Sequence, residues 1–525
     1  MVSQSINRSG GSRFIPNTIA LVFQTVFATL ITLAQIKILA SFLSKETFGL
    51  FASLRGFSFL LATLSANGIP LLLVRFIPVH ESNRERREVV RLVATSVLSA
   101  TVLLIIVSAL VQVLQNWTFR FATSDQLTFE LYLWFYVTTL GVMLKMILYG
   151  ALNGLRRLTV QLMLEMLSLL AVLVWIAVAR HTLTLPLLFE ILGVVNLVTV
   201  GVGLPVFVHS LRRDVSLTIT GETRREPKVS YRGQYVSYFG WALGLSLVAV
   251  AFTDVDRYIL VQVVSLELLA LFHIGSRISR LANRLIGVAN LAFQPEVTRL
   301  DVEGRDQSVI QSTWIFLKFN SVIGLLMTMA LIVFSGEIIV LVASEQYLPA
   351  IPLLVLLAVS LPLTSMTAPL TTVMKARDQV RGALLCDLGW AVSYVSLILV
   401  LSPPFGLVGV GSAQLVACLA QLLLALKVSN LPIDARSVGL LVSKLIAAGA
   451  VAFMPSVLFG IWVNGRDAGS IGVKLVLFVA GCLVLRWILR VVGLFAADEA
   501  LMLRQLFERR RIGCFVKLIG FERRQ

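Results

Sequence analysis

The chain has 525 residues, of which 57% are hydrophobic and only 14% are charged, and its mean hydropathy is +0.88. Soluble domains carry about 25% charged residues, so this composition excludes an ordinary soluble domain and indicates a polytopic membrane protein. The formal net charge is +17. The cations gather in alternate loops, which is the pattern that sets membrane orientation, so we expect no nucleic-acid partner.

Motifs of common metal, redox and nucleotide sites are missing from the sequence. Four cysteines and four histidines are scattered, with no CxxC pair and no HExxH motif. No Walker A motif is present either. We therefore expect no metal, no cofactor and no ATP hydrolysis by a P-loop, and no constellation of catalytic residues is visible.

Fourteen apolar segments long enough to cross a bilayer predict an all-α membrane protein. In chain order they are 15–43, 48–78, 89–114, 128–150, 159–179, 183–209, 234–263, 266–293, 313–335, 348–373, 383–402, 406–428, 437–463 and 470–492.

These segments divide the chain into six parts. We expect an N-terminal tail, a first six-helix lobe, a connecting loop, a second six-helix lobe, two extra helices and a basic amphipathic tail. Their ranges are 1–14, 15–209, 210–233, 234–428, 437–492 and 493–525.

Basic residues alternate strongly between successive loops. One set of loops holds most of them, including the cluster Arg84, Arg86, Arg87 and Arg91. The other set holds only Lys45, Arg120, Arg180 and Arg466. The positive-inside rule then predicts a multi-pass protein of the cell (inner) membrane with both termini in the cytoplasm. The C-terminal tail is either an amphipathic helix on the anionic membrane surface or a solvated basic segment.

An internal repeat links the two predicted lobes. The segment Ser44–Phe51 recurs as Ser265–Phe272, at an offset of 221 residues, and both copies lie at a turn between two spans. A second pair, Glu165 and Asp387, follows a basic turn in each half at nearly the same offset. We expect spans 1–6 and 7–12 to be two parallel copies, an arrangement that often places a transported substrate between the copies. The paired acids themselves are expected to be helix-packing partners.

Polar residues in spans 1 and 2 suggest a hydrophilic wall. Asn17, Gln24 and Gln35 are spaced by 7 and 11 residues, so they share one helical face. That face suits a wall lined by water or sugar, and interhelical hydrogen bonding is an equally good explanation. Arg55, two turns into span 2, lies near the repeat position of Arg277 and is a candidate cavity cation.

Span 7 contains Asp254, Asp256 and Arg257. Asp254 and Arg257 are three residues apart and can pair on one helical face. Intramembrane acids are candidates for ion coupling, because their protonation changes which conformation is stable. An ion pair that locks spans 7 and 8 together is the alternative.

Span 8 carries a basic face. His273, Arg277, Arg280 and Arg284 follow at i, i+4, i+7 and i+11 and so lie on one side of the helix. A cation deep in a bilayer costs about 2.5–3.5 kcal/mol on insertion scales. The spacing therefore predicts a polar cavity that holds an anion. Alternatively, Arg284 snorkels to the membrane surface, Arg277 pairs with the span 7 acids, and His273 forms an interhelical hydrogen bond.

Around spans 7 and 8 the chain resembles a known family. The relevant motifs are Asp256-Arg257-Tyr-Ile-Leu, Leu271-Phe272 and Phe293-Gln-Pro295-Glu. They are similar to the polysaccharide-flippase branch of the multidrug/oligosaccharidyl-lipid/polysaccharide (MOP) exporter superfamily. The resemblance implies two six-helix lobes in a V around a central cavity and alternating access without ATP hydrolysis.

The same resemblance implies a cargo. Such flippases move a polyprenyl-pyrophosphate-linked oligosaccharide from the inner to the outer leaflet, driven by the membrane potential or by exchange of H⁺ or Na⁺, and their partners are membrane lipids and polysaccharide polymerase or assembly proteins. Arg55 and Arg277 match positions where related lipid flippases carry cavity cations. Arginine also matches pyrophosphate chemically.

Three other functions remain open at this stage. A drug or cation antiporter of the same superfamily would prefer an acidic cavity. A membrane glycosyltransferase or polymerase would need catalytic carboxylates and a substantial outer loop. A non-transporting scaffold is the third alternative.

Overall fold

The computed structural model describes residues 11–66, 68–82, 86–113, 128–155, 157–216, 259–260, 264–377, 379–462, 467–495 and 499. Every regular element in these ranges is a helix, which confirms the predicted all-α class. The chain divides into two compact units, Met1–Ala270 and Leu271–Gln525.

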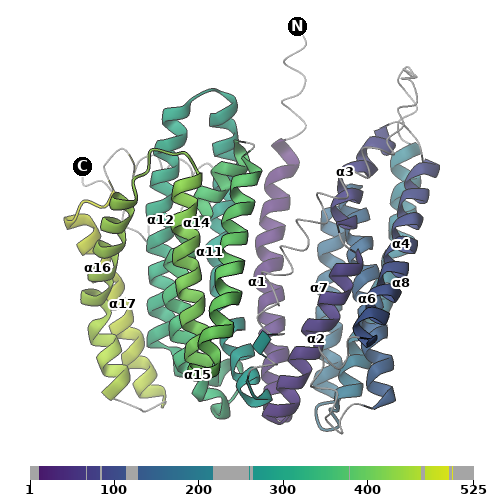
Figure 1. Cartoon of the computed structure of the whole chain (residues 1–525), viewed down its shortest axis with the longest axis horizontal. Helices are drawn as coiled ribbons and strands as arrows, with labels where there is room; N and C mark the ends of the chain where they lie inside the picture. Colours follow the sequence, from purple (N-terminus) through teal and green to yellow (C-terminus); the bar gives the residue numbers. More distant parts are fainter. Residues whose placement is uncertain are drawn as a thin grey trace. The chain divides into compact units, whose positions relative to one another are not determined.

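The first unit is built around one central helix, α6. Its helices are α1 (Gly11–Phe42), α2 (Lys45–Ala66), α3 (Ile69–Ser82), α4 (Arg86–Val113), α6 (Phe129–Gly154), α7 (Leu158–Val178) and α8 (Leu185–Ser216). Helix α6 packs against α2, α3, α4, α7 and α8, while α1 packs mainly against α7 (Figure 1). One helix thus contacts nearly all the others of its unit.

Small residues let α6 approach its neighbours closely. A Cβ atom added at Gly150 would lie 2.7 Å from the Cα of Pro70 in α3, and one added at Gly154 would lie 2.8 Å from the carbonyl oxygen of Leu73. Apolar side chains gain little from burial against one another when the alternative is lipid, so membrane helices associate through such close packing.

The second unit consists of most of α11 and the helices that follow it. Its elements are α11 (Leu266–Val302), α12 (Asp306–Val333), α13 (Ser335–Val342), the 3₁₀ helix η2 (Glu345–Ala350), α14 (Ile351–Ala376), α15 (Val380–Val428), α16 (Ala435–Trp462) and α17 (Ala468–Val491). Helix α14 packs against both α12 and α15, whereas α16 and α17 pack on each other and on α12 (Figure 1).

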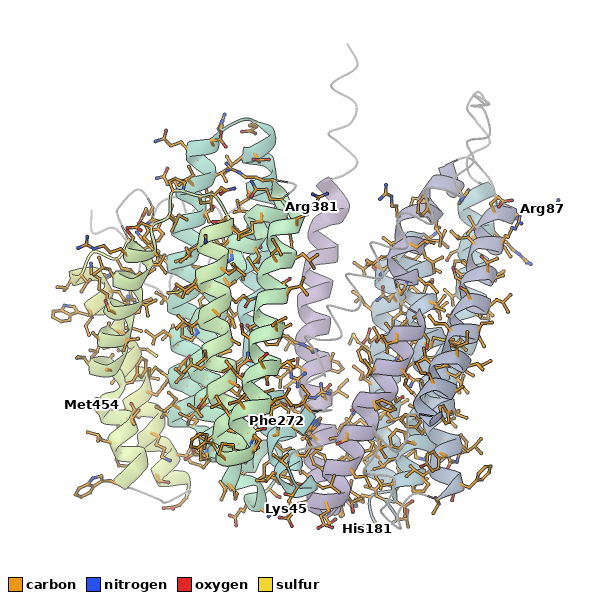
Figure 2. The ribbon with its side chains drawn as sticks, viewed as in Figure 1. Lys45, Arg87, His181, Phe272, Arg381 and Met454 are labelled. Carbon is orange, nitrogen blue, oxygen red and sulfur yellow. The ribbon has the colours of Figure 1, made fainter. Side chains whose placement is uncertain are left out.

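Within each unit, the helices run from one end to the other. Figure 2 shows Lys45 and His181 at one end of the first unit and Arg87 at the opposite end. In the second unit, Phe272 and Arg381 are likewise separated along the bundle. This is the alternation expected of successive membrane spans.

Every predicted span except 234–263 coincides with a described helix or helix pair. Ten helices in the described ranges are long and apolar enough to cross a membrane, and Val26–Phe42 and Ile69–Pro78 are shorter apolar helices. Helix α11 is not among the ten, as expected from the charges along its basic face. The predicted span 234–263 lies almost entirely outside the described residues.

Glycines mark two breaks in the helical backbone, one inside a predicted span and one between two predicted spans. Gly68, with φ of 71°, separates α2 from α3 inside the predicted span 48–78. Gly406, with φ of 55° and ψ of −131°, kinks α15 between the predicted spans 383–402 and 406–428. A side chain makes positive φ unfavourable, so glycine is the residue that permits both breaks.

Helix boundaries follow the sequence repeat. Lys45 begins α2 and Leu266 begins α11, 221 positions later. Helix α6 starts at Phe129 and α14 at Ile351, 222 positions apart. The kink at Gly406 lies 221 residues after Leu185, the first residue of α8. The two halves of the chain therefore break into helices at equivalent points.

Candidate functional site

Helix α11 presents a basic face and an apolar face. On the basic face, Arg277 and Arg280 are half-buried and Arg284 is exposed. The apolar face is closely packed and consists of Gly275, Ile278 (4% exposed), Ala282 (6%), Ile286 (1%) and Phe293. The predicted spacing thus does produce a helix with its arginines on one side.

Contacts with α12 and α14 fix the rotation of α11. A Cβ atom at Gly275 would lie 3.1 Å from Leu353 in α14. Phe293 stacks on Phe316 of α12 with ring centroids 4.2 Å apart. Stacked aromatic pairs and close glycine contacts both require one orientation. Because these residues lie opposite the arginines, packing inside the second unit turns the basic face away from α12 and α14.

Within the basic face, hydrogen bonds follow the helix. Arg280 Nη2 donates to Ser276 Oγ over 3.4 Å, and Ser276 Oγ donates to the carbonyl oxygen of His273 over 3.2 Å. His273 is itself buried, at 5% exposed. A bond of 3.4 Å is long for its type.

An arginine at the end of α14 holds the last turn of α11 in place. Arg377, directly after α14, contacts Asp301 of α11 through Nε at 3.2 Å and also pairs with Asp306 at the start of α12. One guanidinium thereby joins three helices, because its planar fork can bind two carboxylates at once.

In the first unit, Arg55 has a cationic neighbour that the sequence reading missed. Arg55 is half-buried on α2, with its guanidinium carbon 6.0 Å from the ring centre of Phe51. Lys145 of α6 donates from Nζ to Oδ1 of Asn196 in α8 over 2.7 Å and interacts electrostatically with both Arg55 and Glu165. A single lysine inside an apolar helix was the signal that could have identified it.

The predicted polar wall of α1 is only partly described. Gln35 is 1% exposed and donates from Nε2 to the carbonyl oxygen of Leu169 in α7 over 2.8 Å. This is the interhelical hydrogen bond considered as the alternative to a cavity wall. Asn17 and Gln24 lie on α1, but their side chains are outside the described part of the structure.

Three further candidates, Asp254, Asp256 and Arg257, lie outside the described residues. Among the repeat-related acids, Asp387 accepts a hydrogen bond from Gln421 Nε2 over 3.1 Å within α15. That contact agrees with the expected packing role. In the described ranges, no cluster of three or more His, Cys, Asp or Glu residues could hold a metal ion.

The fold is similar to those of solved transporters. "Lipid II flippase MurJ, inward closed conformation" aligns with a TM-score of 0.66 at 14% identity, covering 91% of this chain and 99% of that one. An inward-facing "multidrug resistance MATE family transporter of the MOP superfamily" aligns with a TM-score of 0.59 at 15% identity, covering 80% and 99%. An outward-facing structure with the same family description aligns at 0.55 with 16% identity, covering 79% and 96%. At these identities the likeness concerns the fold.

Comparison with curated protein sequences gives no significant match. A family comparison does: the family described as "Polysaccharide biosynthesis protein" matches residues 14–301, more than half of the chain. This match includes the first unit's described helices, apart from the first three residues of α1, and nearly all of α11. The protein therefore belongs to the polysaccharide biosynthesis protein family and has the membrane-transporter fold of the MOP superfamily.

Proposed function

We propose that the protein is a flippase that moves a polyprenyl-pyrophosphate-linked oligosaccharide from the inner to the outer leaflet for surface polysaccharide assembly. The observation that carries this proposal is the basic face of α11, which lies opposite the apolar face packed on α12 and α14. Membership of a polysaccharide biosynthesis family supports a glycan as cargo. The fold shared with a lipid II flippase supports movement of a lipid-linked molecule.

The arginines suit the most charged part of such a cargo. A guanidinium binds phosphate oxygens through two parallel N–H donors and stays charged at any physiological pH. Arg277 and Arg280 are half-buried, so their attraction for an anion is screened less than that of the exposed Arg284. We assign pyrophosphate binding to Arg277 and Arg280, and Arg284 acts as an outlying attractive charge. Arg55 of the first unit is a separate candidate for binding the same anion.

No covalent step is needed for this activity. The cycle alternates access to the two leaflets, and His273, Asn17 and Gln24 supply polar contacts to the glycan. Asp254, Asp256 and Arg257 couple the cycle to H⁺ or Na⁺, since intramembrane acids form ion pathways and proton relays in pumps and transporters. Both termini lie in the cytoplasm, and the proposed partners are membrane lipids and polysaccharide polymerase or assembly proteins.

A drug antiporter is the second candidate, because two of the similar folds are those of multidrug transporters. Cationic drugs would need acids on the cavity wall. The arginines of α11 repel such cargo, so we rank this function below the flippase.

The test replaces Arg277 and Arg280 separately with Ala in cells whose surface glycan depends on this protein. We expect loss of surface glycan together with accumulation of the lipid-linked oligosaccharide, at unchanged protein level. Arg87→Ala, an exposed change at the first turn of α4, is the control and should leave the glycan intact. Normal glycan in both α11 variants would refute the binding role, and drug resistance conferred by the protein would favour the antiporter.

A further inference from the structure

Gly287 continues the row of cations on α11. It lies seven residues, or nearly two turns, after Arg280 and three residues after Arg284, so it falls on the same helical face. The buried residues of this helix, such as Ile286 at 1% exposed, lie around the opposite side. The basic face therefore extends beyond Arg284 to a position that has no side chain.

A side chain at Gly287 would meet open space. A Cβ atom added there would lie within 4 Å of no heavy atom in the described part of the structure. On the packed face of the same helix, a Cβ atom at Gly275 would lie 3.1 Å from Leu353. Close helix contact thus explains Gly275 but not Gly287, and glycine destabilises a helix interior relative to alanine.

Register with the arginines distinguishes Gly287 from other glycines. Open space also surrounds four further glycines in the described helices, namely Gly201, Gly439, Gly469 and Gly472. Glycine is common in membrane helices, and none of these four continues a row of arginines at helical spacing. Gly287 combines free space with a place on the basic face.

The position of Gly287 along α11 indicates which part of the cargo lies beside it. Seven residues of helix separate Gly287 from Arg280, which is about 10 Å along the axis. The loop charges predict that α11 runs from the outer side to the cytoplasmic side, and Gly287 then lies on the cytoplasmic side of the arginines. A lipid-linked glycan in the inner leaflet keeps its prenyl chain in the hydrocarbon and its polar sugars toward the cytoplasm.

We propose that Gly287 forms a sugar subsite, in which the missing side chain leaves room for the sugar nearest the pyrophosphate when the cargo is loaded from the inner leaflet. This inference rests on the proposed function, because the pyrophosphate bound by Arg277 and Arg280 fixes where the first sugar lies. The exposed Arg284, between Arg280 and Gly287, offers N–H donors to the sugar hydroxyls. Gly287 is therefore a specificity-determining residue that limits the size of the first sugar.

A size series at position 287 tests this subsite. Gly287→Ala adds one methyl group, whereas Gly287→Leu and Gly287→Trp fill the space progressively. In cells whose surface glycan depends on the protein, we expect near-normal export with Ala and a loss of at least about tenfold with Trp, because the added bulk excludes the sugar. The purified full-length variants in detergent should bind farnesyl pyrophosphate, which carries no sugar, as tightly as the wild type. Gly201→Trp, in open space on α8, is the matched control and should export normally.

Four results would overturn the subsite. Normal export in both Gly287→Leu and Gly287→Trp would show that the space is not used. A loss with Gly287→Ala as large as that with Gly287→Trp would show a need for helix flexibility. Weaker binding of farnesyl pyrophosphate by the Leu and Trp variants would place the phosphate at this position instead of the sugar. An equal loss in Gly201→Trp would show that bulk in any open position disturbs export. Thermal unfolding identifies the folded variants, and Gly287→Leu decides if Gly287→Trp fails to fold.

Arg277→Ala in the same two assays separates the subsite from the proposed function. If this variant loses both farnesyl pyrophosphate binding and export while every Gly287 variant exports normally, the proposed function stands and the subsite is rejected. If Arg277→Ala retains both, the proposed function fails and the subsite with it.

Discussion

Glu499 forms a buried ion pair that joins the chain beyond α17 to α12. Both carboxylate oxygens lie 3.0 Å from Lys318 Nζ. The side chains are only 12% exposed for Lys318 and 11% for Glu499. The ammonium also lies 5.4 Å from the ring centre of Trp314 and 5.9 Å from that of Phe495. Replacing Glu499 with Ala therefore leaves an ammonium enclosed by aromatic rings without its counter-charge.

The expected loss is large because a buried charge remains. Removing one partner of a buried pair costs about 3–5 kcal/mol. The cation–π contacts of Lys318 with the two rings are present both before and after the change, so they leave this difference unaltered and we expect a destabilisation of about 3–5 kcal/mol. The double change Lys318→Met with Glu499→Leu removes both charges and should restore most of this loss, since apolar pairs of similar volume replace buried ion pairs at little cost.

Thermal unfolding of the purified protein in detergent measures this difference. The matched control is Glu303→Ala, which breaks the more exposed pairs of Glu303 with Arg299 at 3.5 Å and Arg305 at 3.3 Å. That change should cost about 0–1 kcal/mol. The reasoning is refuted if Glu499→Ala destabilises no more than Glu303→Ala, or if the double variant is less stable than the single one.

Two glycine changes test the backbone arguments by thermal unfolding as well. Gly150→Ala puts a methyl group 2.7 Å from the Cα of Pro70, so α6 and α3 must separate, at about 1–3 kcal/mol. Gly406→Ala forces a side chain into φ 55°, ψ −131° and should cost about 1–3 kcal/mol. Gly439→Ala, where a Cβ meets open space, is the control for both and should leave stability unchanged or raise it slightly. The explanation would be contradicted if Gly439→Ala lowered the stability as much as Gly150→Ala and Gly406→Ala do.

Local patterns in the sequence predicted the helices of this protein, the basic face of α11 and the points where some helices begin. Long apolar segments predicted the helices. Lipid offers no hydrogen-bond partners to the backbone, and a helix satisfies its backbone groups within a single segment. The spacing from His273 to Arg284 predicted a basic helical face, since 3.6 residues per turn is a local property. The 221-residue repeat likewise predicted where α2 and α11 begin.

Such local patterns could not predict contacts between segments that are distant in the sequence. Asn196 meets Lys145, Glu499 meets Lys318, and Gln35 meets the backbone of Leu169 only after the helices have packed. Gln35 shows the consequence: its spacing suited a cavity wall, yet its neighbour in α7 makes it a helix-packing residue.

The sequence alone determined the membrane class, the helix positions and the side of α11 on which the arginines lie, because hydropathy and helical periodicity act within a few turns of chain. Only the tertiary structure decided which face of α11 is buried and which cations have acids beside them. Those outcomes depend on close approach between helices, where a single glycine or carboxylate hundreds of residues away decides the contact.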